Sequence, residues 1–286
     1  MGSTFLWIIA VVSAAYSVFG LVLYFMQSAL LYSPVRAIQY TPGGLGLDFE
    51  DITFKSKDGL RLSGWYVPAK NSDFTVLFCH GNGGNMTYNL DGVNLFYDMG
   101  LSCFIFDYRG YGSSEGTPGE EGTYLDGMAA YKWLTEEKKI PASNIIIFGR
   151  SLGGSIAAYL ASRVECVSLV IESGFTSYAD IGKKFYPYLP VRMFAKFNYS
   201  TVDYAKKVHC PLMIIHSRED DIVPFELGQK LYKAANEPKK FVEIFGGHND
   251  GFLLSAEIYN EAWAEWLKFV GGQKSKATQP RISRIF

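Results

Sequence analysis

A serine stands between two glycines in the pentapeptide Gly149-Arg150-Ser151-Leu152-Gly153. The pattern G-x-S-x-G is typical of a nucleophilic serine when a strand precedes it and a helix follows it. Both are expected here, because residues 144–148 are mostly apolar and residues 152–163 are rich in small side chains. The glycines allow a turn too tight for Cβ atoms, and a helix that begins after the serine favours developing negative charge. We therefore predict that Ser151 is a nucleophile.

A nucleophilic serine needs a base to take its proton, and the base needs a carboxylate to orient it. In folds with this strand-to-helix serine, Asp or Glu follows along the chain and His comes last. Of the four histidines, His248 fits that order best, because it lies between the last expected strand and the last expected helix. His80 precedes the serine, and His209 and His216 flank an earlier expected strand. We predict His248 as the base.

Four carboxylates compete for the role of the orienting acid. Glu219, Asp220 and Asp221 lie in the loop after the expected strand 212–215, and Glu172 ends the preceding expected strand. Adjacent side chains point in different directions, so we expect only one of Asp220 and Asp221 to orient the base and the other to be solvated. The residues alone leave the choice open.

Acyl transfer also requires N–H donors for the oxyanion of the tetrahedral intermediate. The backbone N–H of Leu152, directly after the candidate nucleophile, is one expected donor. A second is expected from the glycine-rich loop 80–85, which follows the apolar run 75–79. A glycine-rich turn without function is the alternative. A nucleotide-binding loop is disfavoured, because neither a P-loop Lys-Ser/Thr pair nor G-x-G-x-x-G is present.

Strand and helix patterns alternate along most of the chain. A hairpin with the turn Lys57-Asp58-Gly59 comes first. The alternation that follows predicts an α/β fold with a mostly parallel sheet of about eight strands, helices on both faces and an antiparallel edge. The expected strands are 49–55, 60–67, 75–79, 102–106, 144–148, 167–171, 212–215 and 240–245, and the expected helices are 86–99, 124–138, 152–163, 226–236 and 256–270.

One segment interrupts the alternation. About forty residues separate the expected strands 167–171 and 212–215, which is more than a simple crossover needs, and they are rich in aromatic side chains. We expect residues 176–206 to form a small lid over the site, with an ordinary crossover helix and a long loop as the alternative. The expected α/β-hydrolase-type domain spans 47–271, between a Pro/Gly-rich linker at 33–46 and a polar tail at 272–286.

Residues 1–32 are expected to form a membrane anchor. No charged side chain precedes Arg36, and residues 5–26 are almost entirely apolar or small. At about 1.5 Å per residue this stretch would reach roughly 33 Å as a helix, enough to cross the hydrocarbon of a bilayer. A cleaved signal peptide would want basic residues before the apolar run, and a core helix would show a polar face. Arg36 alone leans toward a cytoplasmic domain, and both sides of the membrane stay open.

Composition limits the class of partner. The chain has 286 residues, of which 48% are hydrophobic and 19% charged, and its net charge is −1. These values are those of a globular protein and provide no electrostatic reason to expect a nucleic acid partner.

Cys166 and Cys210 each open an expected strand, so they could touch if the two strands are parallel neighbours. Both a disulfide and a reduced pair are compatible with that arrangement.

Five motifs together resemble the α/β-hydrolase superfamily: HGNxxN at 80–85, FDYRGYGxSxG at 106–116, GRSLGG at 149–154, DxIVP at 220–224 and GGHND at 246–250. With the N-terminal anchor, the chain looks like the membrane-anchored branch, whose members are described as serine hydrolases, esterases, lipases or protein depalmitoylases. The resemblance covers roughly 49–270. It selects Asp220 as the acid and the N–H of Asn82 as the second oxyanion donor, and it implies no metal and no organic cofactor. Asp107 and Arg109 are expected to brace loops.

The expected function is hydrolysis of carboxylic esters or thioesters with apolar acyl groups, by way of Ser151, His248, Asp220 and an acyl-enzyme. A lipid or an acylated protein is the expected kind of substrate, and the lipid bilayer is the expected partner of the N-terminal helix. Two alternatives remain. A serine peptidase of the same fold is disfavoured because no additional gating domain is evident, and a catalytically silent scaffold is disfavoured because the three residues are intact.

Overall fold

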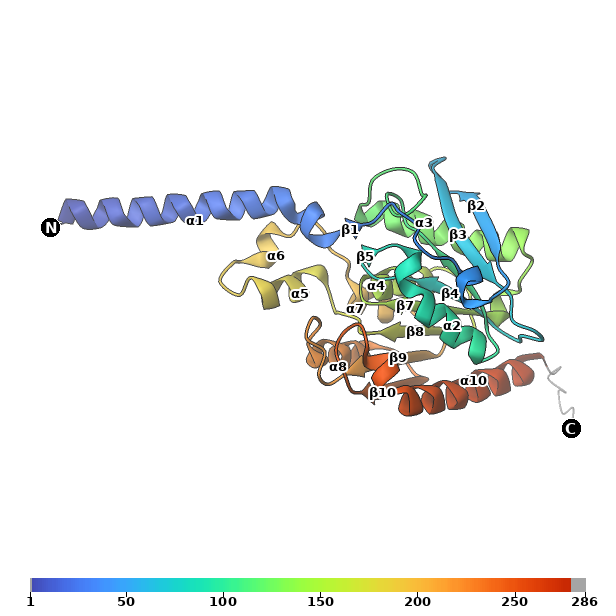
Figure 1. Ribbon diagram of the computed structural model, residues 1–286. Coiled ribbons are helices and arrows are strands. Elements are labelled where there is room, and N and C mark those ends of the chain that lie inside the picture. Colours follow the sequence, from blue (N-terminus) through green and yellow to red (C-terminus); the bar gives the residue numbers. More distant parts are fainter. Residues whose placement is uncertain (1, 279–286) are drawn as a thin grey trace, which may run out of the picture.

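The computed structural model of the protein describes residues 2–278. An eight-stranded sheet with the order β10-β9-β8-β7-β4-β6-β3-β2 forms its centre (Figure 1). The strands from β4 to β10 in this sheet run parallel, while β2 and β3 form an antiparallel hairpin at one edge. The predicted fold class is thereby confirmed. The strands are β2 (Glu50–Lys55), β3 (Arg61–Val67), β4 (Thr75–Cys79), β6 (Ser102–Phe106), β7 (Ile145–Arg150), β8 (Ser168–Glu172), β9 (Leu212–Ser217) and β10 (Lys239–Ile244).

Helices cover both faces of the sheet because its central strands are apolar on both sides. One core contains side chains from α3 (Glu120–Lys132), α4 (Leu152–Ala161), α7 (Thr201–Ala205) and α8 (Phe225–Ala234). The opposite core contains side chains from α2 (Leu90–Asp98), α9 (Gly251–Leu254) and α10 (Ala256–Thr278). The sheet is therefore buried between two layers, and its carboxyl ends are left to carry a site.

Several predicted element bounds are corrected. The helix expected at 86–99 divides into the 3₁₀ turn Met86–Asn89 and α2. The helix expected at 124–138 begins earlier, at Glu120, and ends in the π-helical turn Trp133–Glu137. The first residues of the polar tail expected at 272–286 belong to α10, which continues to Thr278. The remainder of the tail, 279–286, lies outside the described residues.

The linker segment 33–46 is docked on the domain. Its first residues form β1 (Ser33–Pro34), which pairs with β5 (Gly83–Gly84), and Pro42–Leu45 form a 3₁₀ turn. The carbonyl of Val35 accepts hydrogen bonds from the Asn85 side chain and from the N–H of Gly112. The extended backbone of 33–46 thus finds partners on the glycine-rich loop 80–85 and at Gly112, which is why it docks.

The N-terminal helix α1 (Gly2–Leu31) projects from the domain as a rod, and two short helices lie beside its C-terminal part (Figure 1). These are α5 (Tyr178–Phe185) and α6 (Val191–Phe194), which belong to the segment 176–206. Among the described residues, α1 is the one helix long and apolar enough to cross a membrane.

The thiols of Cys166 and Cys210 touch, with a Sγ–Sγ distance of 3.2 Å, and both cysteines are free. The two cysteines precede β8 and β9, which are parallel neighbours. This is the arrangement in which the sequence predicts that the two thiols could touch.

Candidate active site

Ser151 occupies the turn between β7 and α4 and has a positive backbone φ of 54°. Such a conformation is strained for a residue with a side chain, and it is characteristic of a serine held out from a strand-to-helix turn. A Cβ on Gly149 would lie 2.2 Å from the carbonyl oxygen of Gly153, and a Cβ on Gly153 would lie 2.0 Å from that of Cys79. The two glycines are therefore required by close backbone contacts, as expected.

Three of the predicted side chains lie in one hydrogen-bonded row. The Oγ of Ser151 is 2.9 Å from Nε2 of His248, and Nδ1 of His248 is 2.8 and 3.0 Å from the two carboxylate oxygens of Asp220. A carboxylate can only accept, so Nδ1 carries the proton and Nε2 is left as the acceptor for the serine hydroxyl. This arrangement can move a proton from a serine to an imidazole.

The environment keeps Asp220 ionised. Burial, the largest single effect, raises the pKa of its carboxyl, but the hydrogen bond and charge of His248, the N–H of Val223 and the charge of His216 together outweigh burial and hold that pKa below its usual value. The backbone N–H groups of Ile222 and Val223 donate further bonds to Oδ1, at 2.9 and 2.6 Å. A carboxylate with these partners can stabilise an imidazolium at His248.

The other acidic candidates have different partners. Glu172 accepts from Nε of Arg150 and from the hydroxyl of Tyr259, both at 2.6 Å, and no bond joins it to His248. Asp221, the neighbour of Asp220, is exposed, as expected of the aspartate that does not orient the base. Its Oδ1 also accepts from the backbone N–H of His248 at 3.0 Å.

Glu219 holds the same loop from its other end, because its Oε2 accepts from the N–H of Gly246 at 3.0 Å. Residues 219–221 thus fasten the His248 loop at three points, two on its backbone and one on the imidazole. Sequence reasoning missed the two backbone contacts, and the run of three consecutive acids was the available signal.

The remaining histidines lie elsewhere. His80 is buried between the rings of Tyr108 and Tyr111, where it supports the glycine-rich loop. His216 is buried beneath the 219–221 loop, with Nε2 3.0 Å from the Val223 carbonyl, and His209 is exposed. His248 is the histidine that reaches Ser151.

The two predicted oxyanion donors lie beside the serine. Leu152 is the first residue of α4, so its N–H has no intrahelical acceptor. Asn82, Ser151 and Leu152 line the same cavity. A Cβ on Gly81 would be in contact with the Cβ of Ser151 at 3.7 Å, which shows how closely the glycine-rich loop approaches the serine.

Asp107 and Arg109 brace loops, as expected. Asp107 accepts from the N–H of Met86 at 2.8 Å. The guanidinium of Arg109 contacts the buried carboxylate of Asp126 and the half-exposed carboxylate of Asp58, each at a shortest distance of 2.7 Å.

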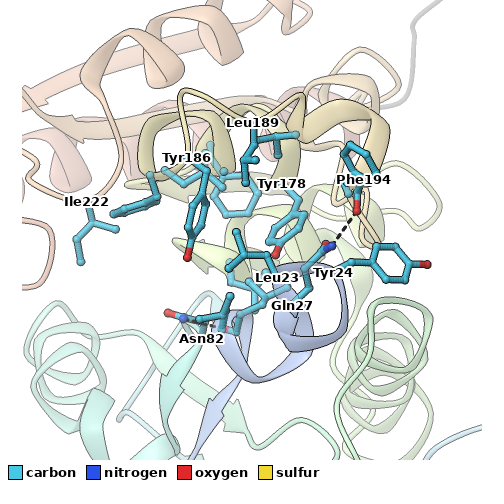
Figure 2. A pocket seen from close by; sticks show the side chains of 18 of the residues that line it. Leu23, Tyr24, Gln27, Asn82, Tyr178, Tyr186, Leu189, Phe194 and Ile222 are labelled. Carbon is cyan, nitrogen blue, oxygen red and sulfur yellow. Dashed lines mark hydrogen bonds between the residues drawn. The ribbon is translucent and has the colours of Figure 1, made fainter. Parts of the chain in front are cut away.

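A cavity of about 380 Å³ extends from Ser151 between α1 and the segment 176–206. Its lining is mostly apolar, and Figure 2 shows Leu23 of α1 opposite Tyr178 and Tyr186. Sequence reasoning treated α1 only as an anchor and missed this wall. Gln27 was the available signal, because an amide on an apolar helix needs a protein partner.

Comparisons with known proteins agree with this architecture. A family model described as the alpha/beta hydrolase fold matches residues 75–191. The alpha/beta hydrolase domain-containing protein WAV2 of Arabidopsis thaliana is 31% identical over 87% of this chain and 90% of its own length. A Saccharomyces cerevisiae protein named as a membrane protein is 31% identical over 81% of this chain and 86% of its own.

Among solved structures, an esterase of Pyrococcus furiosus superposes with a TM-score of 0.70 and 25% identity, covering 83% of this chain and 97% of the esterase. This similarity extends the match beyond residues 75–191 to most of the domain. The chain belongs to the α/β-hydrolase family.

Proposed function

We propose that this hydrolase is a membrane-anchored serine esterase or thioesterase that acts on apolar acyl groups, with Ser151, His248 and Asp220 as its catalytic triad. The observation that carries the proposal is the continuous row from Ser151 Oγ through His248 to Asp220, with hydrogen-bond distances of 2.9 and 2.8 Å, at the end of an apolar cavity. The similarity to an esterase supports the reaction class.

In the first half-reaction, Ser151 Oγ attacks the substrate carbonyl carbon while its proton passes to Nε2 of His248. Asp220 stabilises the imidazolium, and the N–H groups of Leu152 and Asn82 donate to the oxyanion. The carbon–oxygen or carbon–sulfur bond then breaks, and the leaving alcohol or thiol takes the proton from His248. An acyl-serine remains.

In the second half-reaction, water attacks the acyl-serine carbonyl while His248 takes its proton. The bond to Ser151 Oγ breaks, the serine regains its proton from His248, and a carboxylic acid leaves. The proposal requires no metal and no organic cofactor.

The proposed membrane anchor is α1. It has 30 residues and therefore spans about 45 Å, whereas the hydrocarbon of a bilayer is about 30 Å thick. Large apolar side chains are exposed along it from Phe5 onward, and exposed apolar surface of this extent is typical of contact with lipid. The similarity to a yeast membrane protein supports the same location.

The segment 176–206 is proposed as a lid, because its aromatic side chains form one wall of the cavity that leads from Ser151. The catalytic domain spans 47–271 in this proposal, with the docked segment 33–46 between it and the anchor.

Hydrolysis of p-nitrophenyl octanoate and of octanoyl thioester by the full-length protein in detergent tests this function. Ser151→Ala should lower kcat by on the order of 10³-fold or more. Ser155→Ala is the matched control, because this serine is buried on the same helix and its Oγ has no partner among the described residues. Equal activity of wild type and Ser151→Ala would refute the proposal.

A further inference from the structure

The C-terminal half of α1 is docked on the domain. Its partly buried and buried positions include Gly20, Leu23, Gln27 and Leu31, which recur at the spacing of one helical face. Gln27 donates from Nε2 to the Phe194 carbonyl and accepts at Oε1 from the N–H of Lys196, each at 2.7 Å. A tether that only localised the domain would need no such contacts.

The docked face of α1 forms one wall of the cavity that leads to Ser151. Six residues of the helix line it: Gly20, Leu23, Tyr24, Gln27, Leu30 and Leu31. The opposite wall comes from the segment 176–206, and Figure 2 shows Tyr178, Tyr186 and Leu189 on that side. From Gly20 to Leu31 the helix rises about 16 Å, so the cavity can accept an extended chain rather than a compact group.

The far end of this cavity lies where the helix leaves the domain. Residues 2–19 of α1 are exposed throughout and extend about 27 Å, close to the thickness of the bilayer hydrocarbon. Gly20 therefore stands near the membrane surface when residues 2–19 span the bilayer.

The segment 176–206 presents side chains suited to that surface. Tyr188 is 89% exposed and Met193 is 81% exposed, and both are apolar over most of their area. The basic side chains of Lys183, Arg192 and Lys196 are exposed on the same segment, where they can meet lipid phosphates. The hydroxyl of Tyr16 on α1 donates to the carbonyl of Tyr188 at 2.6 Å. This bond holds the exposed side chains of the segment 176–206 beside α1, about one helical turn before Gly20.

We infer that α1 is a structural part of the substrate site: its Gly20 and Leu23 bound the acyl pocket, and the substrate is a fatty acyl ester or thioester that enters from the bilayer. This inference rests on the proposed function. Gly20 leaves the membrane end of the pocket open, since a Cβ there would meet no heavy atom within 4 Å. The carbonyl reaches Ser151 while the chain lies along α1.

The test compares p-nitrophenyl palmitate with p-nitrophenyl acetate, using the full-length protein in phosphatidylcholine vesicles. Gly20→Phe should lower the palmitate-to-acetate ratio of kcat/KM by about fourfold for each methylene that loses its apolar contact. Leu21→Phe is the matched control, because Leu21 is exposed on the same turn and does not line the cavity. Its ratio should equal that of wild type.

A second measurement does not depend on folding of the Gly20 variant. An alkyl fluorophosphonate with a diazirine at its chain end is attached to the wild-type protein and irradiated. Cross-links to α1 within Gly20–Leu31 are expected. Hydrolysis of a phospholipid or of an S-palmitoylated peptide in the same vesicles then identifies the source of the acyl chain.

An unchanged ratio in Gly20→Phe, or cross-links that avoid α1, would overturn the inference while Ser151-dependent hydrolysis of the acetate persists. Absence of any Ser151-dependent hydrolysis would instead refute the proposed function, and the inference with it.

Discussion

The side-chain amide of Asn82 donates a 2.9 Å hydrogen bond to the carbonyl oxygen of Leu31, the last residue of α1. Carbonyls in the last turn of a helix have no intrahelical partner, so this bond completes the end of α1. The carbonyl of Asn82 in turn accepts from the hydroxyl of Tyr111 at 2.7 Å and from the N–H of Ser33 at 3.2 Å. The loop that carries a proposed oxyanion donor is thus fastened to the end of α1.

Replacement Asn82→Ala should lower kcat by about tenfold to 10²-fold with a smaller change in KM, because the backbone donor remains but its position is no longer fixed. Steady-state kinetics with p-nitrophenyl acetate measure this. Asn94→Ala is the control, since its amide bonds Asp98 on α2, away from the site. Identical kinetics for the two variants would show that the Leu31 contact has no role in turnover.

The two neighbouring aspartates should differ in effect. Asp220→Asn removes the negative charge that stabilises the imidazolium and places an amide NH2 where it can donate to His248 Nδ1, which favours the wrong tautomer. It should lower kcat by on the order of 10⁴-fold. Asp221→Asn keeps an acceptor for the N–H of His248 and should cost about tenfold or less. The measurement is kcat for both variants under one set of conditions. The assignment of the acid fails if Asp221→Asn proves the more damaging.

Stability should depend on the brace at Arg109. Arg109→Ala leaves the buried carboxylate of Asp126 uncompensated and should lower the free energy of unfolding by about 3–5 kcal/mol. Asp58→Ala removes the more exposed partner and should cost about 1 kcal/mol or less. Urea unfolding followed by tryptophan fluorescence compares the two. Equal losses would mean that the Asp126 pair is not the stabilising contact.

Acid should destabilise the protein partly through His216. Burial lowers the pKa of this imidazole below its usual 6.5, outweighing the nearby carboxylate of Asp220. The unfolded chain therefore binds the proton more readily, so stability is complete above 6.5 and is lost as the pH falls through the folded-state pKa, by up to about 1.4 kcal/mol per pH unit.

His216→Gln retains an N–H donor for the Val223 carbonyl and cannot titrate. Its melting temperature should fall less than that of wild type between about pH 7.5 and about pH 5.5. Parallel melting curves with equal acid sensitivity would contradict the role given to His216.

The succession of strands and helices along the chain and the positions of Ser151 and His248 could be predicted because their signals are local. An apolar strand, a turn that excludes Cβ atoms and a helix of small residues coincide within 144–163. The contacts of Glu219 and Asp221 could not be predicted in the same way. Their acceptor roles depend on where the backbone of the His248 loop comes to lie, and residue type does not encode that position.

The docking of α1 on the domain could not be predicted from hydrophobic periodicity, for a different reason. Every face of this helix is apolar, so hydrophobic periodicity cannot distinguish a face that packs on protein from one that packs on lipid. The docking of the linker 33–46 could not be predicted either, because its partners include backbone groups of the loop 80–85. Contacts between chain segments far apart in sequence decided both cases.

The most direct test of the central claim is the site of reaction with a fluorophosphonate, read by mass spectrometry of the full-length protein. The account predicts a single adduct on the peptide that contains Ser151, formed with release of fluoride, and its loss in Ser151→Ala but not in Ser155→Ala. Equal labelling of wild type and Ser151→Ala would contradict it.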